Sequence, residues 1–197
     1  MVTLFVTIDP IGLAPVFLAL TAGQSRAERR RVAIRASLIA AGILIGASLV
    51  GEWLLEALGI SLDAFRIAGG LLLFIIAFEM LFNRRQQRKV EQIDASDEAA
   101  HVAAFPLAIP LMAGPGAISA TILVAAGATE AMRLVWLEVI IVVIIGLSFL
   151  AFLSAEWIER ALTRTGRIVL TRLLGLILGA LSVQFVVDGI RSIVASS

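Results

Sequence analysis

Six long apolar stretches are the feature that most constrains this chain. They cover roughly residues 1–22, 33–55, 62–82, 103–127, 134–155 and 168–190. Each offers the ~20 mostly apolar residues that a helix needs to cross the hydrocarbon core of a bilayer. The chain is 60% hydrophobic and 16% charged over 197 residues, a surplus that a soluble globule of this size could not bury. The sequence therefore predicts an all-α membrane protein with six transmembrane helices.

The residues that build most enzyme active sites are scarce. The sequence has no cysteine and a single histidine, His101, which leaves no material for thiolate chemistry or a histidine metal cluster. A serine-type intramembrane hydrolase would need that histidine or the sole lysine, Lys89, beside its serine, and both lie in a polar linker. An aspartyl type needs two facing acids, and only Asp9 lies in the middle of an apolar stretch. We therefore expect no enzymatic activity, cofactor or metal. The net charge of +1 gives no reason to expect a nucleic-acid partner.

Basic residues are concentrated in alternate loops, which predicts the orientation of the chain. Thirteen of the 16 lysines and arginines lie on one side of the expected membrane or just inside it. Because cytoplasmic loops carry the excess of positive charge, we expect these loops in the cytoplasm, both termini outside it, and a multi-pass protein of the plasma (inner) membrane. The larger group comprises Arg26, Arg29, Arg30, Arg31, Arg35, Arg84, Arg85, Arg88, Lys89, Arg160, Arg164, Arg167 and Arg172, and the smaller one Arg66, Arg133 and Arg191.

The two halves of the chain are similar to each other. Residues 9–12 match 114–117, residues 51–54 match 155–158, and residues 66–69 match 172–175, at offsets of 105, 104 and 106 positions. Three matches in the same order at a nearly constant offset indicate an internal repeat. With three spans in each copy the second copy must insert upside down, which gives an inverted 3+3 repeat, an architecture of secondary transporters. The expected organisation is a first three-helix repeat (1–83), a cytoplasmic linker (84–101) and a second, inverted three-helix repeat (102–197).

All five prolines lie in the first expected span of the two repeats, together with several glycines. Proline removes a backbone donor and clashes with the carbonyl four residues before it. We therefore expect both spans to be broken, with half-helix N-termini near Gly12–Pro15 and Gly116–Ser119. Such N-termini carry unpaired amides and a positive dipole that suit a carboxylate. The alternative is a pair of merely kinked helices. The residues concerned are Pro10, Gly12, Pro15, Pro106, Pro110, Gly114, Pro115 and Gly116.

Four segments resemble the MarC family of membrane proteins. Residues 7–18 (TIDPIGLAPVFL) resemble its first signature and residues 106–118 (PLAIPLMAGPGAI) its second, while residues 66–70 (RIAGG) and 184–190 (QFVVDGI) fit the ends of the two repeats. The resemblance covers essentially the whole chain, and the second signature is quite specific. The family is also called the neutral amino acid transporter group and is placed near the LysE-type exporters.

The resemblance implies six spans and, from characterised relatives, movement of glycine, alanine and similar amino acids driven by the proton gradient. The chain departs from the family in one respect. Relatives have several more apolar residues before the first signature, whereas only eight residues precede Asp9 here. We therefore expect either a start codon assigned too far downstream or a short first half-helix.

The leading hypothesis is a proton-coupled secondary transporter of small neutral amino acids. In it the substrate carboxylate lies on the amides of the two half-helices, the ammonium faces freed carbonyls or the Asp9 carboxylate, and one repeat rocks against the other. The expected partners are a small neutral amino acid, protons and membrane lipid, and the chain could form a homo-oligomer. The candidate substrate-binding residues are Asp9, Pro10, Gly12, Gly114, Pro115, Gly116, Ser119 and Gln184.

Asp9 and Glu79 are the candidates for proton coupling, and each has an alternative role. An acid near the bilayer centre is functional by default, but Asp9 could instead cap freed amides, and the Asn found at this place in the family favours a cap. Glu79 could be an acid that snorkels to the cytoplasmic surface. Ser119 could bind substrate or cap its own helix, and Gln184 could join helices to each other.

Other polar and small residues have structural interpretations. Asp188, three residues before Arg191, predicts an ion pair at a helix end. The acids toward the ends of the spans are interpreted as interfacial: Glu52, Glu56, Glu138, Glu156 and Glu159. Four glycines are expected to let helices approach closely: Gly69, Gly70, Gly175 and Gly179.

Two other classes of function compete with this hypothesis. An exporter or channel for another small solute is the main alternative, and a membrane scaffold without transport is a third class. A carrier saturates and responds to a pH gradient, a channel does not saturate easily, and a scaffold does neither.

Overall fold

The computed structural model describes residues 2–82, 107–127, 131–161 and 164–196. Within these ranges every regular element is helical. The elements are α1 (Val2–Ile8), α2 (Pro10–Leu20), α3 (Arg26–Ala57), α4 (Leu62–Leu81), η1 (Leu107–Met112), α7 (Pro115–Ala126), α8 (Ala131–Leu153), α9 (Ala155–Ala161) and α10 (Arg164–Ser196). The expected linker 84–101, with Lys89 and His101, lies outside the described residues, as does Pro106.

In the part of the chain that the structure describes, five of the six expected spans are helices long and apolar enough to cross a membrane. They are Val2–Leu20, Arg26–Ala57, Leu62–Leu81, Met132–Leu153 and Ile168–Ala195. The expected span 103–127 is represented by two shorter pieces, η1 and α7. The prediction of an all-α protein with helices of membrane length is confirmed.

The helix α3 begins earlier than hydropathy predicts, at Arg26 instead of residue 33. Ser25 and Glu28 form a capping box, in which the Ser25 amide donates to Glu28 Oε2 over 2.8 Å and the Glu28 amide donates to Ser25 Oγ over 3.4 Å. This reciprocal pairing satisfies two amides that would otherwise lack partners. The polar, arginine-rich first turns are therefore helical although they are not apolar.

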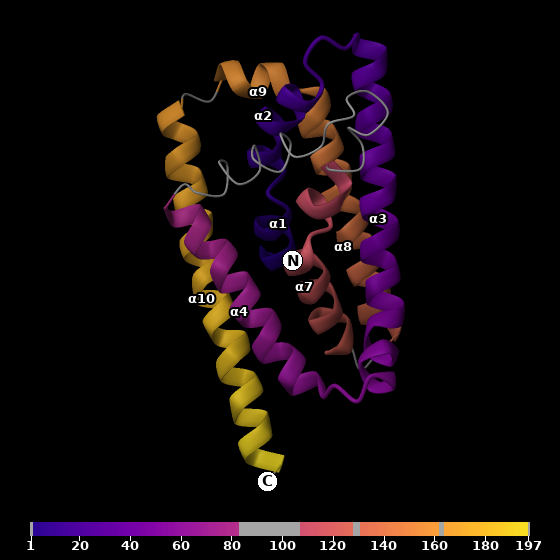
Figure 1. Ribbon diagram of the computed structural model, residues 1–197, viewed down its shortest axis with the longest axis vertical. Helices are drawn as coiled ribbons and strands as arrows, with labels where there is room; N and C mark the ends of the chain where they lie inside the picture. Colours follow the sequence, from indigo (N-terminus) through magenta and orange to yellow (C-terminus); the bar gives the residue numbers. More distant parts are fainter. Residues whose placement is uncertain (1, 83–106, 128–130, 162–163, 197) are drawn as a thin grey trace.

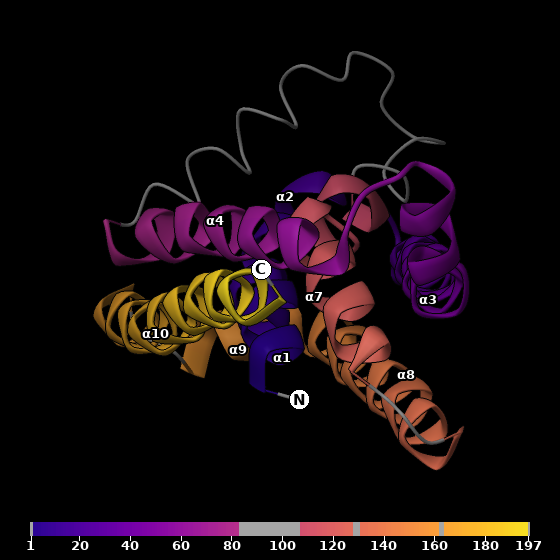
Figure 2. The same ribbon diagram turned by 90° about the horizontal axis from the view of Figure 1, so that it is seen from below.

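The long helices enclose the short ones (Figures 1 and 2). The helices α4 and α10 run side by side on one side, α3 and α8 lie on the other, and α1, α2 and α7 lie between them. The share of buried residues follows this arrangement. It is 67% in the most apolar window of Val2–Leu20 but only 22% in that of Ile168–Ala195. The first span is therefore the central one, and the long helices present apolar side chains outward.

The helices α4 and α10 form a closely packed antiparallel pair. A Cβ atom at Gly70 of α4 would lie 2.8 Å from the carbonyl oxygen of Ser182 in α10, and one at Gly175 would lie 2.9 Å from the Cβ of Met80. Both distances are too short for a real side chain, so the two backbones can approach this closely only because glycine is present.

The predicted close packing at glycines is confirmed at three of four positions. Gly69 also belongs to this group, because a Cβ there would lie 3.1 Å from Leu123 Cδ1 of α7. Gly179 makes only an ordinary contact, with its added Cβ 3.7 Å from that of Ala77. The helix α4 therefore uses adjacent glycines, Gly69 and Gly70, to approach α7 and α10.

The end of the molecule where α2, α3 and α9 meet is joined by an ion pair. Arg29 Nη1 lies 2.8 Å from Glu156 Oε1 of α9, and Arg29 Nε donates to the carbonyl oxygen of Thr21 over 3.3 Å. Deeper in the bundle, the rings of Phe17 and Phe152 stack with centroids 4.9 Å apart. These contacts fix α2 against the second half of the chain.

The glycine packing predicts different effects on stability for two matched substitutions. We expect Gly70→Ala to destabilise the protein by about 1–3 kcal/mol, because the methyl group overpacks the contact with α10. We expect Gly46→Ala, at a helical position where an added Cβ meets nothing within 4 Å, to be neutral or to stabilise by up to about 1 kcal/mol. Thermal unfolding in detergent micelles, followed by tryptophan fluorescence, measures both. Equal midpoints for the two variants would contradict the packing argument.

Candidate functional site at two interrupted helices

The first span is divided at Asp9, where the chain leaves the helix. Asp9 has a left-handed backbone conformation with φ 55° and ψ 65°, its amide donates to Phe5 O over 2.9 Å, and its carbonyl accepts from the Leu13 amide over 3.0 Å. Its side chain caps the next helix, with Oδ1 accepting from the Gly12 amide over 3.0 Å. Among ordinary residues, Asp and Asn best tolerate this conformation. Asp9 is therefore both the end of α1 and the N-cap of α2.

The start of α2 differs from the prediction. A half-helix N-terminus near Gly12–Pro15 is wrong, because α2 begins at Pro10 and contains Pro15. Pro10 occupies the first helical position, where a missing amide costs nothing. Gly12 lies directly beneath the Asp9 carboxylate, and a Cβ atom there would overlap the carboxylate oxygens. Gly12 therefore makes room for the cap.

The second interruption precedes α7. Ile109 within η1 is extended, with φ −128° and ψ 125°, and the Ala113 amide donates to Ala108 O over 2.8 Å. Gly114 is the N-cap of α7 and Pro115 its first residue. Glycine has no side chain to accept a hydrogen bond, and in the described part of the chain no acceptor is found for the amides of Gly116 and Ala117. Unlike α2, α7 therefore begins with an uncapped N-terminus.

The two interruptions lie next to each other. A Cβ atom at Gly116 would lie 3.4 Å from Cγ2 of Thr7, two residues before Asp9, and would overlap Cδ1 of Ile76 in α4. Figure 1 shows α2 rising from this level and α7 descending from it. Asp9 is only 4% exposed and Gly116 is buried, whereas Pro115 is exposed. The start of α7 is thus enclosed on one flank and open on the other.

The hydroxyl groups near the interruptions differ in their hydrogen bonds. Thr7 Oγ1 donates to Thr3 O over 2.6 Å and Thr121 Oγ1 to Ala117 O over 2.8 Å, each within its own helix. Ser119 is 5% exposed, and its hydroxyl makes no hydrogen bond in the described part of the chain. Ser119 lies against Gly69 of α4, with its Oγ 3.9 Å from the position of an added Cβ. Of these hydroxyls, the one of Ser119 has bonding capacity left for a ligand.

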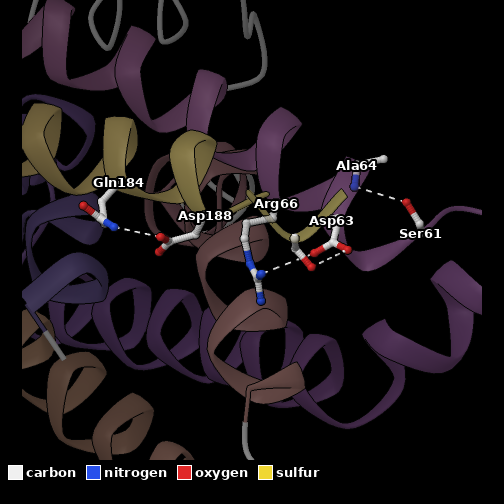
Figure 3. A network of polar contacts seen from close by, with 7 residues as sticks. Ser61, Asp63, Ala64, Arg66, Gln184 and Asp188 are labelled. Atoms are coloured by element: carbon white, nitrogen blue, oxygen red, sulfur yellow. Dashed lines mark hydrogen bonds and ion pairs between the residues drawn. The ribbon is translucent and has the colours of Figure 1, made fainter. Parts of the chain in front are cut away.

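The structure places Gln184 and Glu79 in other surroundings. Gln184 lies on α10 with an exposed side chain, and its Nε2 donates to Asp188 Oδ1 over 2.8 Å (Figure 3). Glu79 is half-buried in the last turn of α4. The predicted ion pair between Asp188 and Arg191 is wrong, because no such pair forms in the described ranges, where Asp188 instead accepts from Gln184.

One buried polar contact differs from what the sequence predicts. Glu138 of α8, which its place near a span end predicts to be interfacial, is half-buried, and its Oε1 accepts a hydrogen bond from the hydroxyl of Ser48 in α3. Its second oxygen, Oε2, is buried. Glu138 lies close to the polar start of its apolar stretch. Hydropathy indicates how deep a residue lies in the membrane, but it does not indicate which neighbouring helix the side chain faces. No signal in the sequence alone identifies Ser48 as the partner.

This bundle of apolar helices around two interrupted ones defines a multi-pass integral membrane protein. Residues 1–194 match the MarC family of integral membrane proteins, and the chain belongs to that family. It is 40% identical over 191 residues to the UPF0056 membrane protein MJ1677 of Methanocaldococcus jannaschii, covering 96% of this chain and 93% of the relative. It is 38% identical to the UPF0056 membrane protein YhcE of Escherichia coli, covering 96% and 89%. No solved structure shows a significant match to the chain.

The conformation of Asp9 predicts which substitutions it tolerates. We expect Asp9→Asn to retain most of the stability, since the amide oxygen can cap Gly12 and Asn tolerates positive φ. We expect Asp9→Ala to lose about 2–4 kcal/mol, combining the lost cap with the cost of a left-handed alanine. Thermal unfolding of the two purified variants compares them directly. An Asp9→Ala variant as stable as Asp9→Asn would show that the cap is unimportant.

Proposed function

We propose that this protein is a secondary transporter of small neutral amino acids of the glycine and alanine class, coupled to protons. The observation that carries the proposal is the uncapped N-terminus of α7, which lies beside the interruption at Asp9 in the interior of the bundle. Unpaired amides at a helix N-terminus attract a carboxylate through their hydrogen bonds and the helix dipole. Transporters bind anionic groups of their substrates at discontinuous helices in this way.

The asymmetry between the two interruptions favours one orientation of the substrate. The N-terminus of α2 already has a carboxylate oxygen from Asp9 on the Gly12 amide. We therefore assign the substrate carboxylate to the amides of Gly116 and Ala117, and the ammonium to the side of Asp9. The Ser119 hydroxyl, one turn into α7, supplies a further hydrogen bond. The small side chain of glycine or alanine suits a site lined by glycines.

The arrangement of the helices supports an inverted repeat with the halves at 1–83 and 102–197. The third helices of the two proposed repeats, α4 and α10, are antiparallel, since Ser192 near the end of α10 donates to Asp63 at the start of α4 over 2.8 Å. The half-helices α2 and α7 point in opposite directions (Figure 1). Rocking of one repeat against the other would give alternating access to the site.

The ends of the long helices support the proposed orientation. The arginine-rich start of α3 and the start of α10 lie at the same end of the molecule, at the top of Figure 1, and α4 runs upward toward that end. The positive-inside rule assigns that end to the cytoplasm. The protein would then be a multi-pass protein of the plasma membrane with its termini on the other side, and it would act without an enzymatic step or cofactor.

Uptake of radiolabelled glycine and alanine into proteoliposomes tests the proposal. We expect saturable uptake that rises with an inward proton gradient. Non-saturating flux would favour a channel, and outward transport of another solute would favour an exporter. Absence of uptake by protein shown to be folded and inserted would contradict the proposed substrate class.

Ser119 and Thr121 provide a matched pair of variants for the site itself. We expect Ser119→Ala to lower kcat/KM for alanine uptake about 5- to 10-fold, the effect of losing one hydrogen bond worth ~1 kcal/mol to the substrate. Thr121→Val should leave uptake close to wild type, because the Thr121 hydroxyl is already bonded to Ala117 O. Equal kinetics for the two variants would remove Ser119 from the site.

A further inference from the structure

The first turns of α3 carry four exposed arginines, which form two pairs on different faces of the helix. Arg26 and Arg30 make one pair, Arg31 and Arg35 make the other, and the members of each pair are four positions apart. Residues at this spacing lie one above the other on a helix surface. The residues that continue each line along α3 show which face the pair occupies.

The line below Arg26 and Arg30 enters the protein. At helical spacing it continues through Ala33, Ser37 and Ala40, and all three are buried. Ala33 and Ala40 belong to the hydrophobic core of the bundle. Protein therefore fills the space below this pair, and no lipid chain can extend along the helix from it.

The line below Arg31 and Arg35 stays on the outside. It continues through Leu38, which is 67% exposed, and Gly42, where an added Cβ atom would meet nothing within 4 Å. The exposed Leu49 lies further along the same line. The helix α3 forms one edge of the bundle (Figure 2). This second pair therefore lies at the head of an apolar strip that faces lipid.

Arg31 and Arg35 carry positive charges that the described part of the chain does not pair. Neither residue forms an ion pair there, and like charges at this spacing repel each other. Glu28, three positions before Arg31, is bonded to Ser25 in the capping box. Arg35 lies within the apolar stretch, so its guanidinium group must reach the headgroup layer to remain hydrated.

We propose that Arg31 and Arg35 bind the headgroup phosphate of an anionic phospholipid, whose acyl chains lie along Leu38 and Gly42. Guanidinium groups match the arrangement of phosphate oxygens, and basic residues beside a membrane span attract anionic lipids. The apolar strip favours a lipid over a free phosphate ion, which has no chain to place there. The bound phosphate offsets the repulsion between the two arginines. This inference does not depend on which solute the protein transports.

Native mass spectrometry of the full chain in detergent, titrated with phosphatidylglycerol, tests the site. The variant Arg31→Gln/Arg35→Gln and its control Arg26→Gln/Arg30→Gln remove the same charge at the same spacing from the same helix. We expect the affinity for the first phosphatidylglycerol to fall about 10- to 30-fold in the first variant and to stay close to the wild-type value in the control. Arg35→Gln alone should show part of the loss, so the test does not depend on the folding of the double variant.

Two further titrations separate the lipid from other occupants of the site. The wild type should bind phosphatidylglycerol more tightly than phosphatidylcholine. Glycerol phosphate, a soluble headgroup without chains, should not displace phosphatidylglycerol at equal concentration. Equal affinities in the two double variants, or a wild type without preference for phosphatidylglycerol, would overturn the proposal. Displacement by glycerol phosphate would show an anion site that does not recognise the lipid chains, and would also overturn it.

Discussion

The hydrocarbon core of a bilayer offers no water to a backbone amide or carbonyl that leaves a helix. The rest of this structure depends on that constraint. The backbone is interrupted at Asp9 and around Gly114, and both interruptions lie in short helices between the pairs α4–α10 and α3–α8. The span that contains Asp9 is the most buried of the five of membrane length. The long helices have a regular backbone and can face lipid. They keep lipid away from the two places where the backbone leaves the helix.

Glycine serves this arrangement in two distinct ways. At Gly70 and Gly175 the missing side chain lets α4 and α10 come into backbone contact, which closes the outer wall. At Gly12 the missing side chain leaves the volume that the Asp9 carboxylate fills when it caps α2. The first use gives tight packing between helices. The second lets the Asp9 side chain accept a hydrogen bond from a backbone amide where no water is present. A bundle with a broken helix at its centre needs both.

Hydropathy predicted the membrane-length helices because the length of an apolar run directly reflects the thickness of the bilayer. Local chemistry was harder to predict. The left-handed conformation of Asp9, which starts α2 at Pro10, goes with the cap that its side chain forms on the Gly12 amide, and the order of residues alone does not predict it. The contact between Glu138 and Ser48 depends on how α8 is rotated about its axis relative to α3, and the distribution of apolar residues does not predict that rotation. Gln184 looked available for a ligand, but its partner Asp188 lies one turn further along the same helix.

The pairing of α4 with α10 has a consequence for the order of synthesis. The chain leaves the ribosome from its N-terminus, so α4 enters the membrane well before α10 exists. In that interval the face of α4 that will contact α10 lacks its protein partner, and Asp63 at its start still lacks the hydroxyl of Ser192. The first half can therefore insert early but can mature only when the last helix arrives. The C-terminal helix is thus the closing piece of the bundle, and a chain that ends before it would leave α4 without its partner.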